Sequence, residues 1–357
     1  MRIVCRTAVS LAVGMLGFGL AQPGLAGSTP RYEVVKTVPL GAPDRWDYVA
    51  FDPASRRVYV AHGDRVTVVN GRTGAIVGEV QGFPGGTHGI AIVGAYGRGY
   101  TDDGQAGEAG AFSLETLKVE KRIKAADDSD AIAFDPVSGH VFVVNGDPGT
   151  LTVIDPRTDA AIATVEVGSK LEYPVAGGDG KLYVNGVARR EIFRVDTRTN
   201  QVDARWPIPS CASPHGLAMD PAGRRLFSSC ENDELVVVNA DSGGVVATLP
   251  IGSGTDAAAF DSRRKLIFSS NGEDGTLSVI EERDRDTFVP LGTVKTALTA
   301  RTMSLDPRTG RLYVVAADVD ARALAAAQAM AARGDRPRRR VPIVPGSLKL
   351  IFLDPAP

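Results

Sequence analysis

The sequence of 357 residues carries a formal charge of −2 at pH 7, so no overall positive charge points to a nucleic-acid partner. Its 40 glycines, its low aromatic content and its many valine, alanine and threonine residues are typical of a β protein with many tight turns. A repeat that runs through the chain indicates one large domain rather than two smaller ones.

The N-terminal segment, residues 1–26, has the features of a secretory signal peptide. Arg2 and Arg6 provide a positive start, residues 8–21 form an apolar run, and residues 24–26 (GLA) form a cleavage site of the small-x-small type. A membrane anchor, the alternative, would need a longer apolar run. We therefore expect a mature chain that begins near Gly27 and lies in the periplasm or outside the cell.

Residues 211–251 contain the pattern that the rest of the chain repeats. Three short apolar runs, at 217–219, 225–227 and 235–238, are separated by turn-rich segments, and a fourth run covers 245–251. This arrangement is typical of a four-stranded antiparallel meander. Such a sheet cannot bury its own two faces, so its copies have to stack on one another.

Seven segments align on the first strand of this pattern, with a period of about 42 residues. One position is small in every copy: Ala50, Ala91, Ala133, Ala176, Ala218, Ala259 and Ser304. The following residue is large except at Gly177: Phe51, Ile92, Phe134, Met219, Phe260 and Leu305. Because side chains alternate across a strand, the bulky face of one copy can pack on the small face of the next.

These observations predict an all-β fold, a seven-bladed β-propeller of four-stranded antiparallel blades over residues 27–357. In the last copy, residues 312–315 and 348–353 supply the second and third strands, and the outer strand is missing. We expect residues 32–40, near the start of the mature chain, to join this C-terminal blade as its outer strand. This closure would leave no open sheet edge.

One departure from the repeat is the insertion at residues 318–346. Asp318 is placed to cap a helix over Ala321–Arg333 that ends at Gly334. An arginine-rich run follows at residues 336–340. The arginines suit phosphates or an acidic partner, but no aromatic residues are interleaved for base stacking. The insertion interrupts the connection between the second and third strands of the last blade, so we expect it on a loop face.

Three strand segments resemble the Tyr-Val-Thr-Asn strand of the YVTN-repeat β-propellers. They are residues 58–61 (VYVA), 141–145 (VFVVN) and 182–185 (LYVN), and each is followed by a strand that ends in Asn or Asp. The chain is similar to this family over nearly its whole mature length, and within the family to the periplasmic YncE-like group. The resemblance implies the propeller fold and raises single-stranded DNA as a ligand, without a motif that transfers a role to any residue.

The loops that lead into the first strands place one residue per blade at the axial mouth of a propeller. These residues are Asp47, His88, Asp130, Tyr173, His215, Asp256 and Arg301. Imidazoles and carboxylates that converge on one axis suit a divalent cation. We expect the two histidines and some of the three aspartates to hold a metal, and Arg301 to orient an anionic substrate. A water-filled mouth lined with polar groups is the alternative.

The loops between the second and third strands open on the same face. They add His62, Asp102, Asp103, Asn145, Asn185, Glu231, Asn271 and Asp318. Together with Arg301 and Tyr173, we take Asn145, Asn185, Glu231 and Asn271 as candidate ligand-binding residues. His62 and His140 are expected to be exposed and without function. The opposite face carries Asp-Pro and Thr-Gly turns, which need no role beyond turn chemistry.

Two of the three cysteines, Cys211 and Cys230, belong to the same repeat and follow the predicted cleavage site. One precedes the first strand of the repeat and the other follows its second strand, so both lie at the same edge of a meander. In an oxidising compartment this placement predicts a disulfide bond. A thiolate metal site is the alternative.

Several site types have no counterpart in the sequence. It contains no Cys-x-x-Cys-His motif, which excludes covalent c-type haem. It also contains neither a Gly-x-Ser-x-Gly motif nor a phosphate-binding loop. We interpret the protein as a secreted or periplasmic monomer that acts as a binding platform for a small molecule or an envelope protein. A metal-assisted, lactonase-like hydrolase and a single-stranded DNA-binding protein are the alternative functions.

Overall fold

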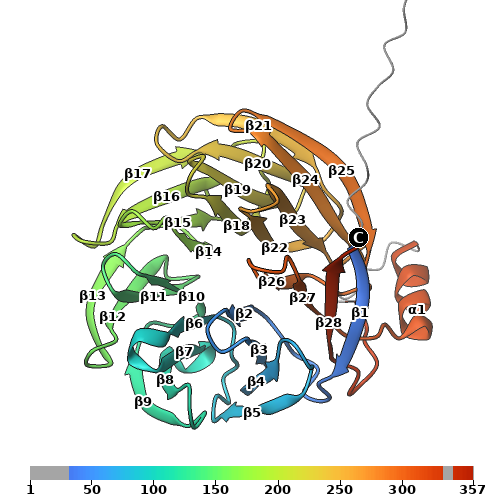
Figure 1. The fold of residues 1–357 in the computed structure, drawn as a ribbon, viewed down its shortest axis with the longest axis horizontal. Coiled ribbons are helices and arrows are strands. Elements are labelled where there is room, and N and C mark those ends of the chain that lie inside the picture. Colours follow the sequence, from blue (N-terminus) through green and yellow to red (C-terminus); the bar gives the residue numbers. More distant parts are fainter. Residues whose placement is uncertain (1–31, 333–340, 357) are drawn as a thin grey trace, which may run out of the picture.

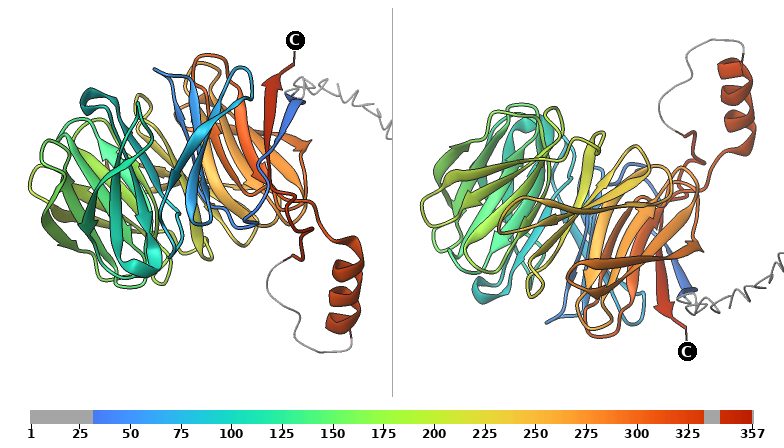
Figure 2. Two further views of the ribbon diagram at one scale, coloured as in Figure 1. Left: turned by 90° about the horizontal axis from the view of Figure 1, so that it is seen from below. Right: turned by 90° about the horizontal axis from the view of Figure 1, so that it is seen from above.

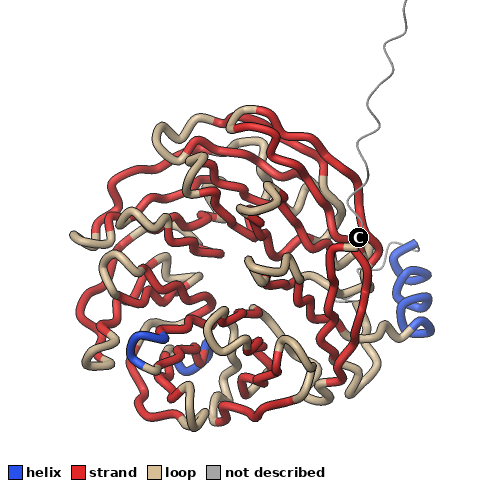
Figure 3. The backbone as a smooth tube through the Cα atoms, viewed as in Figure 1, coloured by secondary structure: helices blue, strands red, loops and turns tan. Residues whose placement is uncertain are grey.

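The computed structural model describes residues 32–332 and 341–356. Seven four-stranded antiparallel sheets surround one axis, which confirms the predicted seven-bladed β-propeller (Figure 1). Strands account for nearly all of the regular structure (Figure 3). The predicted signal peptide, residues 1–26, lies outside the described residues. Among the residues described, no helix has the length and the apolar character needed to span a bilayer.

The first three blades follow the chain from the inner strand to the outer one. The first blade contains β2 (Val49–Asp52), β3 (Arg57–His62), β4 (Arg65–Asn70) and β5 (Ile76–Gln81). The second contains β6 (Ile90–Val93), β7 (Arg98–Asp103), β8 (Glu108–Ser113) and β9 (Val119–Lys124), with the 3-10 helices η1 (Gly94–Tyr96) and η2 (Gly104–Ala106) in its turns. The third contains β10 (Ser129–Asp135), β11 (His140–Asn145), β12 (Thr150–Asp155) and β13 (Ala160–Glu166).

The next three blades repeat this order. The fourth contains β14 (Leu171–Ala176), β15 (Lys181–Gly186), β16 (Glu191–Asp196) and β17 (Gln201–Pro207). The fifth contains β18 (Pro214–Asp220), β19 (Arg225–Cys230), β20 (Glu234–Asn239) and β21 (Val245–Pro250). The sixth contains β22 (Thr255–Asp261), β23 (Leu266–Asn271), β24 (Thr276–Asp284) and β25 (Thr287–Lys295).

The last blade closes the ring with strands from both ends of the chain. It contains β26 (Thr302–Leu305), β27 (Leu312–Ala316), β28 (Lys349–Pro355) and, as its outer strand, β1 (Tyr32–Pro39). β1 pairs antiparallel with β28 from Tyr32 opposite Pro355 to Pro39 opposite Lys349. The predicted closure is therefore confirmed, and it covers the edge that β28 would otherwise expose.

Adjacent blades pack through the alternation of small and large residues in their inner strands. Phe134 of the third blade packs in one cluster with Ala91 of the second, and Phe260 of the sixth packs with Ala218 of the fifth. In both pairs the large residue of one blade packs with the small residue of the blade before it. The outer strands carry more exposed positions, as in β5, because no further sheet covers them.

The insertion in the last blade contains the helix α1 (Ala321–Ala332), which stands clear of the blades (Figure 2). Asp320 caps this helix: a carboxylate oxygen accepts hydrogen bonds from the N–H groups of Arg322 and Ala323, at 3.0 Å each. The prediction that Asp318 caps the helix is wrong. Asp318 lies too early in the chain to reach those N–H groups, and its carboxylate pairs with Lys349 instead.

The expected helix end at Arg333 and Gly334 and the arginine-rich run at 336–340 lie outside the described residues. The chain then returns to the propeller, where Val319 and Ile343 form an isolated antiparallel bridge. The N–H of Gly346 donates a hydrogen bond to a carboxylate oxygen of Asp44 at 2.6 Å. The return segment is therefore attached to the loop that leads into the first blade.

The predicted disulfide between Cys211 and Cys230 is confirmed, with the two Cα atoms 5.2 Å apart. Cys211 precedes β18 and Cys230 is the last residue of β19, so the bond joins two points on one edge of the fifth blade. It holds the segment before β18, the strand that carries His215, close to the end of β19, which Glu231 follows.

Candidate functional site

A pocket of about 830 Å³ opens at the axis, on the face where the inner strands begin. We call this pocket the axial mouth. Six of the seven predicted ring residues line it: Asp47, His88, Asp130, His215, Asp256 and Arg301. Arg45 and Glu231 also line it, and so do Val341 and Ile343 of the insertion. The propeller therefore brings together side chains that lie far apart in the sequence.

Register shifts near the start of the inner strands affect several of these positions. The pairing of β10 with β11 shifts between Ser129 and Ala131, so Asp130 stands outside the regular ladder. The same irregularity occurs around Asp256 in β22 and around His215 in β18. A bulge bends a strand and re-aims the side chain that it contains. This local feature explains how the ring side chains turn toward the axis, which strict alternation along a strand does not predict.

Asp47, His88 and Asp130 form a compact cluster in the axial mouth. One ligand atom from each residue lies within 4.8 Å of the other two, and all three residues are half-buried. Among the described residues, no other group of three histidine, cysteine or acidic side chains is as close. Two carboxylates and one imidazole suit a divalent cation such as zinc, manganese or iron.

The buried carboxylate of Asp102 holds His88 in place. One carboxylate oxygen accepts a hydrogen bond from the backbone N–H of His88 at 2.7 Å and lies 3.2 Å from its ring atom Nδ1. The other oxygen accepts a hydrogen bond from the N–H of Gly89 at 2.6 Å. A proton on Nδ1 would be shared with Asp102, which leaves Nε2 as the ligand atom. A carboxylate behind the ring is the usual support of a metal-binding histidine.

Arg45 contacts the other ring nitrogen of His88. Its Nη2 lies 3.2 Å from Nε2. A guanidinium can only donate hydrogen bonds, so Nε2 has to act as the acceptor in this contact. Nε2 can accept only while the imidazole is neutral with its proton on Nδ1, the form that binds metals. The nearby carboxylates favour the imidazolium, so protonation of His88 on Nε2 has to break this contact.

The cluster contains more negative charge than its surroundings neutralise. Burial, followed by the charges of Asp130 and Asp256, raises the pKa of Asp47 to about 8. Burial also raises the pKa of Asp130 to about 6. Burial lowers the pKa of His88, but hydrogen bonding to Asp102 and the nearby carboxylates more than offset this and raise it to about 9. Near neutral pH the metal-free cluster therefore holds protons that a bound cation would displace.

Contacts between acidic side chains and their neighbours dominate the other half of the ring. Nε2 of His215 lies 3.0 Å from a carboxylate oxygen of Glu231, and Nδ1 lies 3.6 Å from Asp256. The second oxygen of Asp256 lies 2.9 Å from Nε of Arg301. The guanidinium of Arg301 also lies 5.3 Å from the centre of the Trp46 ring. In this arrangement His215 and Asp256 contact each other and their neighbours, and neither residue belongs to the cluster around His88.

Tyr173, the seventh predicted ring residue, packs across the axis against Tyr48. Their ring centroids are 4.7 Å apart. Because the first and fourth blades stand on opposite sides of the propeller, the two rings bridge its centre, which the ribbons alone leave open (Figure 1). The pKa of the neighbouring Glu172 lies well above its usual range because of burial and the charges of Asp130, Asp256 and Asp47.

Glu172 and Arg45 are two residues of this site that the sequence interpretation missed. Glu172 precedes an expected ring position by one residue, and the register of β14 shifts between Leu171 and Pro174. Arg45 precedes Asp47 in a loop of no regular structure. Both residues lie within two positions of a predicted ring residue, and this closeness in the sequence is the available signal.

Comparison with known proteins bears on the fold. No family model and no curated protein matches the sequence. A solved structure of the hydrazine synthase of Kuenenia stuttgartiensis is similar, with a TM-score of 0.65 and 15% identity over 75% of this chain and 91% of that one. A chain of a mitotic checkpoint complex superimposes with a TM-score of 0.72 and 13% identity over 97% of this chain and 98% of that one. The likeness is one of fold alone.

Three asparagines predicted as ligand-binding residues are fully buried and bonded within the protein. The amide of Asn185 donates to the carbonyl oxygen of His215 at 2.8 Å. The amide of Asn145 donates to the hydroxyls of Thr150 and Thr152, and the amide of Asn271 bonds to those of Thr276 and Ser278. These contacts fix the loops around the axial mouth. Of the four residues of this loop set that we predicted to bind a ligand, Glu231 lines the mouth itself.

His62 is fully buried, so the prediction that it is exposed is wrong. Its Nε2 lies 2.7 Å from the carbonyl oxygen of Pro43, and its Nδ1 lies 2.8 Å from the hydroxyl of Thr67. Burial lowers the pKa of this imidazole. His62 therefore anchors the loop that carries Arg45 and Asp47 toward the axis. His140, also predicted to be exposed, is half-buried.

Proposed function

We propose that the protein is a binding platform whose axial mouth holds a divalent transition-metal cation through Asp47, His88 and Asp130. The observation that carries this proposal is the buried carboxylate of Asp102, which lies 3.2 Å from Nδ1 of His88, beside the three clustered residues. Together, the ligand set and its support have the composition of a built metal site. Without a cation, the same carboxylates have to be neutralised by protons.

The composition of the site narrows the choice of metal. Two hard carboxylate oxygens and one borderline imidazole nitrogen suit Zn²⁺, Mn²⁺ or Fe²⁺ better than Cu⁺, which prefers sulfur ligands. Three protein ligands leave coordination positions for water or for an anionic group in the pocket of about 830 Å³. In our proposal the ligand of the platform is a small molecule that enters this pocket and binds to the metal.

The proposal also includes a secreted or periplasmic location and membership of the YVTN-repeat propellers of the YncE-like kind. The disulfide between Cys211 and Cys230 supports the location, because disulfides persist in oxidising compartments. The strand segments at 58–61, 141–145 and 182–185 support the family. Fractionation of cells that express the full sequence tests the location: the protein should be found outside the cytoplasm, with residues 1–26 removed.

A metal-assisted hydrolase is a second candidate because the open coordination positions face a pocket that can admit a substrate. Arg301 was the predicted substrate-orienting group, but it is already paired with Asp256 at 2.9 Å. Arg45 is the other guanidinium beside the cluster, with its Nη2 3.2 Å from His88. Assays of lactones and esters with metal-loaded protein test this candidate, and hydrolysis has to disappear in His88→Gln.

The deciding experiment for the metal site is a titration of chelator-treated protein with Zn²⁺ and Mn²⁺ by isothermal titration calorimetry. We expect one cation per chain in the unsubstituted protein and a loss of affinity of at least tenfold in His88→Gln. The matched control is His215→Gln, which changes the other histidine of the axial mouth. Equal affinity in the two variants, or an absence of saturable binding to the unsubstituted protein, would contradict the proposal.

A further inference from the structure

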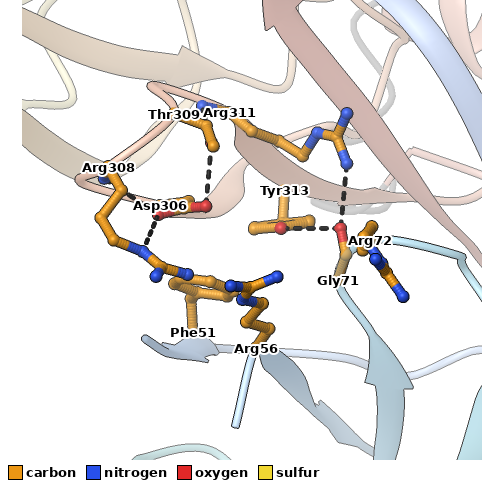
Figure 4. Close-up of a pocket in the computed structure, with 9 residues that line it drawn as sticks. All are labelled: Phe51, Arg56, Gly71, Arg72, Asp306, Arg308, Thr309, Arg311 and Tyr313. Atoms are coloured by element: carbon orange, nitrogen blue, oxygen red, sulfur yellow. Dashed lines mark hydrogen bonds and ion pairs between the residues drawn. The ribbon is translucent and has the colours of Figure 1, made fainter. Parts of the chain in front are cut away.

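A second pocket, of about 390 Å³, lies on the opposite face of the propeller, at the seam where the last blade meets the first (Figure 4). We call it the seam pocket. Its wall comes from the turn between β2 and β3, the turn between β4 and β5, and the turn between β26 and β27. Four of its lining residues are arginines: Arg56, Arg72, Arg308 and Arg311. The axial mouth contributes no residue to it.

The back of the seam pocket is rigid. Tyr313 donates a hydrogen bond to the carbonyl oxygen of Gly71 at 2.9 Å, and its ring stacks on Phe51 with the centroids 5.2 Å apart. Arg311 donates to the same carbonyl oxygen at 3.0 Å and forms a two-pronged ion pair with Asp354, at 2.5 and 2.6 Å. A Cβ atom at Gly71 would meet the Tyr313 hydroxyl at 2.6 Å, so this close approach requires glycine.

The other three arginines have donors to spare. Within the described part of the chain, neither Arg56 nor Arg72 forms an ion pair or a side-chain hydrogen bond. Arg308 has its Nε 3.9 Å from a carboxylate oxygen of Asp306, too far for a hydrogen bond. Figure 4 shows Arg56 and Arg308 projecting toward the Phe51 ring from opposite walls. Guanidinium groups from two blades thus face one cavity.

Asp306 does not neutralise these arginines fully. It is buried, and its carboxylate accepts hydrogen bonds from the N–H of Arg308 and the hydroxyl of Thr309, both at 2.9 Å. This carboxylate therefore holds its own turn together. Asp306 and Asp354 can balance two of the four arginine charges, so two positive charges remain without a partner in the seam pocket.

We propose that the seam pocket binds the phosphate group of a small phosphorylated molecule. A phosphate monoester carries a charge close to −2 at neutral pH and has three acceptor oxygens. Guanidinium groups match such oxygens with pairs of N–H donors, and this geometry favours phosphate over a singly charged carboxylate. The two unbalanced charges and the donors from separate turns suit one dianionic group held between the blades. This site is independent of the proposed metal site.

The test is calorimetric titration at low ionic strength with inorganic phosphate, pyrophosphate and sulfate. The protein carries His88→Gln, so that a metal in the axial mouth cannot capture the anion. We expect saturable binding of one pyrophosphate per chain, weakened about tenfold by Arg56→Gln and by Arg308→Gln. Arg189→Gln, an exposed arginine outside this pocket with the same change of charge, should leave the affinity unchanged. Arg72→Gln is a further variant, and circular dichroism verifies that each variant is folded.

Three outcomes would overturn the proposal. The first is an absence of saturable binding at millimolar anion, and the second is an equal loss of affinity in Arg189→Gln. The third is sulfate binding as tight as that of phosphate, which would mean that the pocket responds to charge without recognising phosphate. A short single-stranded oligonucleotide that displaces pyrophosphate at a much lower concentration would also contradict a small-molecule site and assign the arginines to nucleic acid.

Discussion

Asp102 and His88 form the contact on which the proposed metal site depends, with a carboxylate oxygen of Asp102 3.2 Å from Nδ1 of the imidazole. Asp102 is fully buried, and it also accepts hydrogen bonds from the backbone N–H groups of His88 and Gly89. It therefore fixes both the position of the ring and the nitrogen that carries the proton. A change at Asp102 should alter metal binding without removing any metal ligand.

We expect Asp102→Asn to weaken Zn²⁺ or Mn²⁺ binding by about 10-fold to 100-fold, the usual effect of removing a carboxylate behind a metal-binding histidine. The amide would place an N–H₂ group against N–H donors that the carboxylate now satisfies. The matched control is Asp103→Asn, the next residue, which is also buried and whose carboxylate faces Arg122 at 3.6 Å. Calorimetry on both variants decides: equal affinities would contradict the role assigned to Asp102.

The metal-free protein should lose stability as the pH rises from 6 to 9. The pKa of Asp47, about 8 in the folded protein, lies above its ordinary value, so the folded state binds more protons than the unfolded state until the pH passes about 8. The pKa of His88, about 9, acts with the same sign, because its stabilising protonation is lost as the pH rises through that value. The expected slope is on the order of 1 kcal/mol per pH unit.

Urea unfolding of chelator-treated protein at several pH values measures this slope. Asp47→Asn removes the carboxylate whose pKa is raised most within the cluster. The stability of this variant should therefore depend less steeply on pH. Saturating Zn²⁺ should also reduce the slope, because the cation replaces the protons as the balancing charge. Stability that stays constant or increases between pH 6 and pH 9 in the metal-free protein would contradict the electrostatic description of the cluster.

The fold could be predicted from the sequence because each blade repeats one pattern. A small residue at positions such as Ala91 and Ala218, followed by a large one, indicates directly how adjacent sheets pack. The same regularity predicted that the N-terminal strand completes the last blade. These features depend on period and alternation, which a single sequence displays directly.

The site could be predicted only in outline. Alignment placed six ring residues in the axial mouth, but the two histidines have different surroundings that alignment cannot distinguish. His88 has a buried carboxylate behind it, whereas His215 lies between two acidic side chains. The seam pocket was missed altogether, because Arg56 and Arg308 meet only through ring closure and each belongs to a turn that reads as ordinary turn chemistry.

Gly89 gives a prediction about the packing between blades. A Cβ atom at this position would lie 2.3 Å from the backbone nitrogen of Ile132 in the third blade, and Gly216 meets the backbone of Ala258 in the same way at 2.4 Å. The glycines that follow His88 and His215 therefore permit the next blade to approach. Gly89→Ala should destabilise the fold by about 1–3 kcal/mol, as overpacking does. It should also weaken metal binding, because His88 and Asp130 belong to the two blades that it forces apart.

Gly94→Ala is the matched control, since a Cβ atom there has no neighbour within 4 Å. Thermal unfolding and calorimetric titration of both variants separate the close approach from a general effect of replacing glycine. Equal stability of Gly89→Ala and Gly94→Ala would show that the blades adjust without cost.

The disulfide gives a final prediction, because its two cysteines flank the His215 and Glu231 side of the axial mouth. The double variant Cys211→Ala/Cys230→Ala should lose about 3 kcal/mol of stability, the loop-closure effect expected for a bond that spans 19 residues. Alanine avoids placing a hydroxyl in a buried position. Metal affinity should stay unchanged, since Asp47, His88 and Asp130 belong to the first three blades and the disulfide to the fifth.

Urea unfolding with and without a reductant separates the effect of the bond from that of the side chains. The reductant should destabilise the unsubstituted protein and leave the double variant unaffected. A large loss of metal affinity in the double variant would instead mean that the two halves of the mouth are mechanically coupled.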